Sequence, residues 1–216
     1  MTASEFSALL VLATATSFTP GPNTTLSTAL AANGGLLRAL RFIAAVPVGW
    51  GLLFTLCTAG VGSLVVAVPA LRWAILIGGT GYLLWLARRL WGSRSLSTVD
   101  SSRLQVTFWQ GVGLQFLNIK AWMLALSIVA GWVAGQADAA QRFLMVLPVL
   151  LAFAFFSNLS YALVGSLLRH WLAGPMVDGQ PTGRRLLVFN RLMAVALLLT
   201  AAWMLFGGAG LNGRSA

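Results

Sequence analysis

Two polar interruptions in long apolar runs are the places where this sequence could bind a small molecule. The first is Thr19-Pro20-Gly21-Pro22-Asn23. The two prolines lack amide donors and disfavour helical angles at the residues before them, so a helix should break here. We expect Asn23 to be the N-cap of a second half-helix over residues 24–31, whose amino end would attract an anion. The alternative is a proline kink repaired by hydroxyls such as those of Thr16 and Ser17, with no ligand.

The second interruption, Asn118-Ile119-Lys120-Ala121, contains the only lysine of the chain. Lys120 lies about 12 residues into its apolar run, roughly 18 Å along a helix. A lysine at the centre of a membrane helix costs about 2.5–3.5 kcal/mol, so a structural or functional gain must offset it. We expect Lys120 to face a polar cavity and Asn118 to cap a half-helix. The alternative is that the span starts later and leaves Lys120 near the cytoplasmic interface.

Asn158 and Tyr161 form a third polar group within an apolar run. They are three residues apart and therefore share a helix face, from which both could line the same cavity. Hydrogen bonding between helices as packing is an equal alternative. The candidate substrate-binding residues are therefore Pro20, Gly21, Pro22, Asn23, Asn118, Lys120, Asn158 and Tyr161. Since the four acids of the chain stand at span ends or in loops, this cavity has no acidic side chain to receive a cationic group.

The sequence contains no constellation of catalytic residues. Its acids are Glu5, Asp100, Asp138 and Asp178, and His170 is its only histidine. Neither a paired nucleophile and base nor metal-ligand spacing is present. We predict a protein that is not an enzyme, with no catalytic residues, no metal and no cofactor.

Composition places these residues in a membrane protein. Hydrophobic residues make up 58% of the 216 and charged residues 8%, whereas a soluble domain is about a quarter charged. We predict an all-α integral membrane protein that forms a single transporter domain over residues 5–210. Its expected partner is the lipid bilayer. Its six transmembrane helices are expected near residues 6–31, 42–66, 71–91, 108–134, 143–168 and 186–207.

The arginines predict the orientation of the chain. The net charge of +10 is explained by membrane topology, so we expect no nucleic-acid partner. Loops on one side carry Arg38, Arg41, Arg88, Arg89, Arg94, Arg103, Arg169, Arg184 and Arg185, and the other side carries Arg72, Arg142 and Arg214. Because basic loops remain in the cytoplasm, both termini should be non-cytoplasmic. The Ser- and Arg-rich stretch over residues 92–107 is then a cytoplasmic loop that divides the spans into a 3+3 inverted repeat with broken first and fourth helices.

The first interruption, followed by Gly34-Gly35 and Gly49, resembles the opening signature of the LysE/RhtB family of bacterial amino-acid exporters. Asn118-Ile119-Lys120 resembles that family's Asn-Pro-Lys motif, with Ile119 in place of proline. The resemblance implies efflux of amino acids across the bacterial plasma (inner) membrane, coupled to the proton gradient, and we expect small neutral amino acids or derivatives as substrates. The fifth span has Asn158 where an acidic residue is frequent in the family. A channel-like or ion-exporting relative, a non-transporting scaffold and a homo-oligomer stay open as alternatives.

Overall fold

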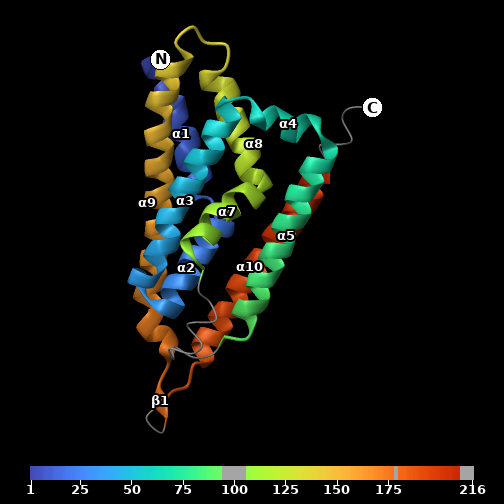
Figure 1. Ribbon diagram of the computed structural model, residues 1–216. Helices are drawn as coiled ribbons and strands as arrows, with labels where there is room; N and C mark the ends of the chain where they lie inside the picture. The colour runs from blue at the N-terminus through green and yellow to red at the C-terminus, as the bar shows by residue number, and fades with distance from the viewer. Residues whose placement is uncertain (94–105, 178–179, 210–216) are drawn as a thin grey trace.

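The computed structural model describes residues 1–93, 106–177 and 180–209, and these residues are almost entirely helical (Figure 1). A two-stranded antiparallel hairpin, β1 (Met176–Val177) with β2 (Gln180–Pro181), joins the last two helices. The helices are α1 (Ala3–Phe18), α2 (Pro22–Gly34), α3 (Leu36–Thr58), α4 (Val61–Ala67), α5 (Pro69–Trp91), α7 (Phe108–Leu117), α8 (Ile119–Ile128), the π-helix η1 (Val129–Val133), α9 (Ala139–Ala173) and α10 (Arg184–Ala209).

Four of the described helices, α3, α5, α9 and α10, are long and apolar enough to cross a membrane. A fifth span results if α7 and the α8–η1 segment, which meet at a bend of 70°, are taken together. The short apolar α1 has only 16 residues. The all-helical membrane fold is therefore confirmed at the level of four or five spans, and the six-span inverted repeat stays a prediction.

The predicted second span, near residues 42–66, is wrong in its bounds. The helix begins at Leu36 and ends at Thr58, and a separate short helix, α4, follows. Gly60, with φ of +90°, ends the regular helix in a left-handed conformation that side chains other than glycine rarely adopt. Part of the proposed cytoplasmic loop, residues 94–105, lies outside the described residues.

Both interruptions found in the sequence are real helix breaks. Helix α1 ends at Phe18, and a new helix, α2, begins at Pro22. It continues away from the N-terminus, toward the lower end of the molecule in Figure 1. The fourth predicted span breaks at Asn118, between α7 and α8. Both breaks lie near the middle of the bundle, and α2 lies inside it, packed between α9, α3 and α10.

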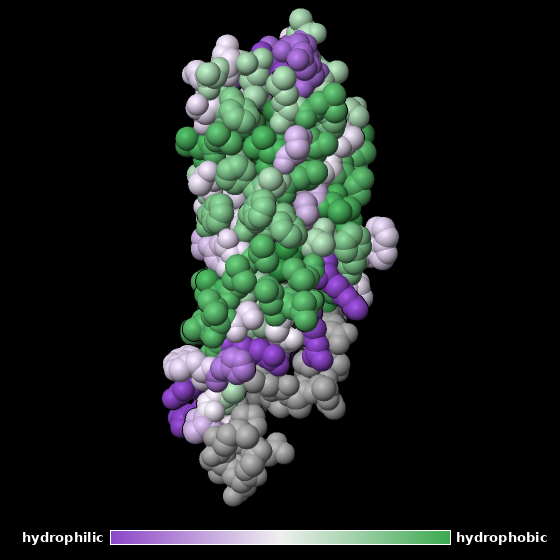
Figure 2. Space-filling view, turned by 90° about the vertical axis from the view of Figure 1, so that its left-hand side faces the viewer, coloured by the Kyte–Doolittle hydropathy of each residue, from purple (hydrophilic) through white to green (hydrophobic). Residues whose placement is uncertain are grey.

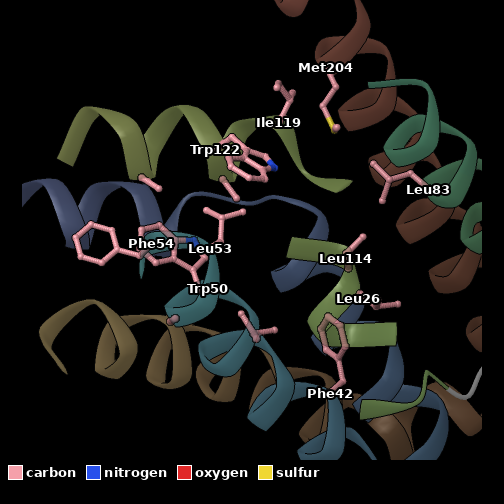
Figure 3. Close-up of a cluster of buried hydrophobic side chains, with 14 of the residues drawn as sticks. Leu26, Phe42, Trp50, Leu53, Phe54, Leu83, Leu114, Ile119, Trp122 and Met204 are labelled. Carbon is pink, nitrogen blue, oxygen red and sulfur yellow. The ribbon is translucent and has the colours of Figure 1, made fainter. Parts of the chain in front are cut away.

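Small residues allow the helices around α2 and α7 to pack closely. A side chain at Gly165 of α9 would overlap with the carbonyl oxygen of Thr28 in α2. A Cβ atom on Gly49 of α3 would lie 2.7 Å from both Val112 O and Gln115 Cγ of α7. Leu26, Phe42 and Leu114, from α2, α3 and α7, belong to the buried apolar core (Figure 3). These contacts fix the position of both broken helices.

A buried amide pair connects α2 to α10 away from the breaks. Asn33 Nδ2 donates to Asn190 Oδ1 at 2.7 Å, and Asn190 Nδ2 returns a hydrogen bond to Asn33 Oδ1 at 2.9 Å. Asn190 Nδ2 also donates to the Ser93 carbonyl at 3.2 Å. Both asparagines are buried, so these bonds offset the cost of removing the amides from water.

The two ends of the bundle carry different charges. The starts of α3 and α10 and the ends of α5 and α9, whose sequences contain arginines, lie at the lower end in Figure 1. The N-terminus lies at the opposite end, where Arg142 forms ion pairs with Asp138 at 2.7 Å and with Glu5 at 3.2 Å. The hydrogen bond from Arg142 is the main reason that the pKa of Asp138 is below its ordinary value. Between the ends, one face of the molecule shows a broad hydrophobic band, as lipid requires (Figure 2).

Candidate functional site

A cavity of about 90 Å³ lies where the two helix breaks meet α3 and α9. That volume holds several water molecules or a small polar solute. Its polar wall contains Thr16, Ser17, Thr19, Gly21, Asn23, Thr24, Asn118, Lys120, Ser157 and Asn158, and the remaining lining residues are Pro22, Val46, Trp50, Ala121, Leu124, Leu150 and Ala154. Six of the eight candidate site residues are therefore brought together. Pro20 and Tyr161 are not among the lining residues.

Asn23 does not cap α2, contrary to our expectation. The helix begins at Pro22, with Gly21 as the N-cap, because proline suits the first helical position, where no amide donor is needed. The Thr24 hydroxyl accepts a hydrogen bond from the Gly21 amide at 2.9 Å. Asn23 is thus a first-turn residue with its side chain free for another partner. The first-turn amides of Asn23 and Thr24 have no acceptor in the preceding turn, and both residues line the cavity.

Asn118 does cap α8, as expected. Its side-chain oxygen accepts from the Lys120 amide at 3.2 Å, and its carbonyl accepts from the Ala121 amide at 2.9 Å. The carbonyl of Phe116, freed by the break, accepts from Trp122 Nε1 at 2.8 Å. The α8 amides are thus partly satisfied within the chain, so α2 presents the more available amide donors at the cavity.

The break after α1 is repaired by hydroxyl groups. Tyr161 donates its phenolic hydrogen to the Phe18 carbonyl at 2.8 Å. The Thr19 hydroxyl donates to the Ala15 carbonyl in the last turn of α1. The Thr16 hydroxyl donates to the Leu12 carbonyl at 2.7 Å, inside the regular helix, and takes no part in the repair. Tyr161 therefore stabilises the broken helix from α9 instead of lining the cavity. The hydroxyl repair and the cavity occur together, so the kink alternative does not exclude a ligand.

Asn158 has both of the roles considered for it. Its side-chain oxygen accepts from the Ser27 hydroxyl at 2.8 Å, and its amide donates to the Ala154 carbonyl at 2.8 Å. These bonds connect α9 to α2, as packing residues do. Asn158 also lines the cavity, with 3% of its surface exposed.

Lys120 is the one ionisable side chain in the cavity wall formed by the described residues. It lies midway along the chain between Phe108 and Val133, the ends of the bent segment. Among the residues that the structure describes, its ammonium has no ion pair or hydrogen bond. Glu5 and Asp138 lie at the N-terminal end of the bundle and pair with Arg142, while Asp100 and Asp178 lie outside the described residues.

Sequence reasoning did not propose several residues of the site, among them apolar wall residues such as Val46 and Leu150 and two with polar groups, Trp50 and Gln115. Trp50 lines the cavity and stacks on Phe54, with ring centroids 5.9 Å apart (Figure 3). Gln115 lies immediately behind the wall and forms two hydrogen bonds with Asn23. A glutamine within an apolar run was a usable signal for Gln115. Trp50 gave none, because nine tryptophans are spread along the chain.

An all-helical fold with a polar cavity at two helix breaks near mid-depth is the architecture of a multi-pass membrane transport protein. Residues 14–208 match the LysE type translocator family, and the chain belongs to that family. This match confirms the predicted family. Together with the relatives described below, it also confirms the prediction of an exporter instead of an enzyme.

Three relatives carry the same name, cysteine/O-acetylserine efflux protein. The one from Klebsiella pneumoniae is 32% identical over 171 residues, which cover 78% of this chain and 86% of the relative. The one from Salmonella choleraesuis is 30% identical over 170 residues with the same coverage. The one from Escherichia coli O1:K1 is 28% identical over 172 residues, again with the same coverage. No solved structure matches the chain.

Proposed function

We propose that this protein exports small neutral amino acids, among them cysteine and O-acetylserine, the compounds named for its relatives. The observation that carries the proposal is Lys120, an ammonium group in a mid-depth cavity with no carboxylate in its described wall. Lys120 is partly buried, and a cation within a membrane segment that has no counter-ion is costly. The carboxylate of an amino acid would supply the missing negative charge.

The other walls of the cavity suit the rest of a zwitterion. The first-turn amides of α2 add an oriented positive field beside Lys120. Side-chain oxygens of Asn118 and Asn158 can accept hydrogen bonds from a substrate ammonium. Val46 and Leu150 offer an apolar surface for a short side chain. A cationic side chain would find no acid in the described wall, so lysine and arginine should be poor substrates.

We further propose six spans arranged as an inverted repeat, with α1 and α2 together forming the first, and coupling of export to the proton gradient. Two breaks whose half-helices meet at one cavity support the repeat. The proposal of coupling rests on the family to which the chain belongs.

We propose that both termini lie outside the cytoplasm, because the arginine-rich end of the bundle is opposite the N-terminus. In a protein with Cys57 replaced, cysteines introduced at Thr182 and Gln136, both exposed, should differ in labelling by a membrane-impermeant maleimide. In intact cells Gln136→Cys should react and Thr182→Cys should not. The reverse pattern would overturn the orientation.

The proposed function is tested by efflux of radiolabelled cysteine, serine and lysine from cells that express the wild type, Lys120→Met or Lys120→Arg at matched abundance. Methionine keeps much of the side-chain length without the charge and should abolish efflux, whereas arginine should keep part of it. Arg88→Met, which removes an exposed arginine, is the control and should transport normally. Unchanged cysteine and serine efflux by Lys120→Met would refute the role of Lys120. Non-saturable flux of the wild type would favour a channel, and no flux a scaffold.

A further inference from the structure

Gln115 is a fully buried polar residue that does not itself line the cavity. None of its surface is exposed, although it stands in the apolar helix α7. The absence of a side chain at Gly49 provides its space, since a Cβ atom there would lie 2.7 Å from Gln115 Cγ. Burial of a primary amide near mid-depth is costly unless its polar atoms are hydrogen-bonded.

The hydrogen bonds of Gln115 have a defined direction. Its Nε2 donates to the Gly111 carbonyl at 3.1 Å, and this bond determines which end of the Gln115 amide is nitrogen. The same Nε2 donates to Asn23 Oδ1 at 3.1 Å, and Gln115 Oε1 accepts from Asn23 Nδ2 at 2.9 Å. The backbone of α7 therefore sets the orientation of Gln115, and Gln115 sets that of Asn23.

Asn23 is a wall residue of the cavity, so its amide orientation matters to a bound molecule. After pairing with Gln115, Asn23 keeps one N–H donor and one oxygen lone pair. A reversed amide would exchange these two groups in front of the substrate. Without Gln115 both orientations would be accessible, because nothing else among the described residues bonds to the Asn23 side chain.

We propose that Gln115 is a positioning residue that fixes the orientation of the Asn23 amide and so helps to set which amino acids the cavity accepts. The inference rests on the proposed function, since it concerns the same cavity. It also explains why the two broken segments are connected directly, through Asn23 after the first break and Gln115 before the second.

A second buried amide pair supplies a matched control. Asn33 and Asn190 form the same reciprocal bonds between helices, and neither lines the cavity. If Gln115 only holds helices together, then Gln115→Met and Asn190→Leu should have similar effects. Both would lower stability or maximal rate and leave the KM unchanged. A positioning role predicts a change in KM and in substrate preference for Gln115→Met alone.

The experiment uses purified full-length protein in lipid vesicles and measures KM and maximal rate for radiolabelled cysteine, serine and alanine. We expect Gln115→Met to raise KM about twofold, because two equally accessible Asn23 orientations halve the binding-competent fraction, and to change the order of the three substrates.

Two outcomes would overturn the inference while the proposed function stands. One is a wild-type KM and substrate order in Gln115→Met, and the other is a loss of maximal rate alone, equal to that of Asn190→Leu. If Gln115→Met does not fold, Gln115→Asn, whose shorter amide cannot reach both Gly111 and Asn23, is measured in its place; an altered KM and substrate order support the inference, and wild-type values contradict it. Failure of the wild type to transport any of the three amino acids would refute the proposed function, and the inference with it.

Discussion

Replacing Gly49 by alanine tests the packing that supports the cavity. Gly49 lies on α3 against α7, and an added Cβ atom would lie 2.7 Å from both Val112 O and Gln115 Cγ, whereas ordinary contact begins at 3.4 Å. The Val112 oxygen belongs to the backbone and cannot rotate away. We therefore expect α3 and α7 to move apart and the Asn23–Gln115 hydrogen bonds to lengthen.

The size of the effect follows from two opposing terms. Overpacking of a tight core costs about 1–3 kcal/mol, and alanine recovers up to about 1 kcal/mol through its higher helix propensity. The two terms leave a net loss of about 0–2 kcal/mol, and its upper end corresponds to a fall of roughly 4–8 °C in the thermal midpoint of a chain of this length.

The assay is thermal unfolding of purified protein in one detergent, followed by intrinsic tryptophan fluorescence. Gly113→Ala is the matched control, because Gly113 lies in α7 itself and nothing lies within 4 Å of its added Cβ atom. Its midpoint should equal or slightly exceed that of the wild type. A midpoint for Gly49→Ala at or above that of Gly113→Ala would refute the reasoning.

Two further variants test hydrogen bonds at opposite parts of the bundle. Tyr161→Phe removes the donor to the Phe18 carbonyl and should lower the free energy of unfolding by about 0.5–1.5 kcal/mol. Tyr82→Phe is the control and should not lower it, because the Tyr82 hydroxyl has no partner among the described residues. Equal thermal midpoints for the two variants would contradict this prediction. Because Arg142 lowers the pKa of Asp138, the ionised carboxylate stabilises the fold above its unfolded-state pKa, and this contribution is lost as the pH falls through the lower folded-state value. The difference in thermal midpoint between the wild type and Asp138→Asn should therefore be largest near neutral pH and disappear in acid, whereas a difference independent of pH would show that the charge has no role.

The breaks and the cavity could be predicted from the sequence because each depends on local chemistry. Proline excludes regular helix wherever it removes a donor, so the break near Pro20 needed no tertiary information. Lys120 was recognisable because a charge at mid-depth has few tolerable environments. The predictions that failed concern residues for which two local conformations are acceptable. Asn23 can cap a helix or enter its first turn, and the preference of Pro22 for the first helical position decided between them.

The bounds of the second span and the role of Tyr161 could not be predicted, because both depend on long-range contacts or on a single backbone angle. The sequence around Gly60 contains no charged residue, so the end of α3 is marked only by the small residues that follow Thr58. Tyr161 shares a helix face with Asn158, yet the position of α1 directs its hydroxyl to Phe18. The central position of α2 could not be predicted from its low hydropathy. Its threonines, serine and asparagine are buried among other helices instead of facing lipid.

The two aromatic donors at the breaks, Trp122 on the Phe116 carbonyl and Tyr161 on the Phe18 carbonyl, have a consequence for the thermodynamics of transport. Because the freed carbonyls already have partners, the irregular backbone keeps its shape while the cavity holds no substrate. An arriving amino acid therefore loses little affinity to ordering of the chain. Its differential affinity for the inward- and outward-open forms is then available to shift the population between them, the step on which alternating access depends.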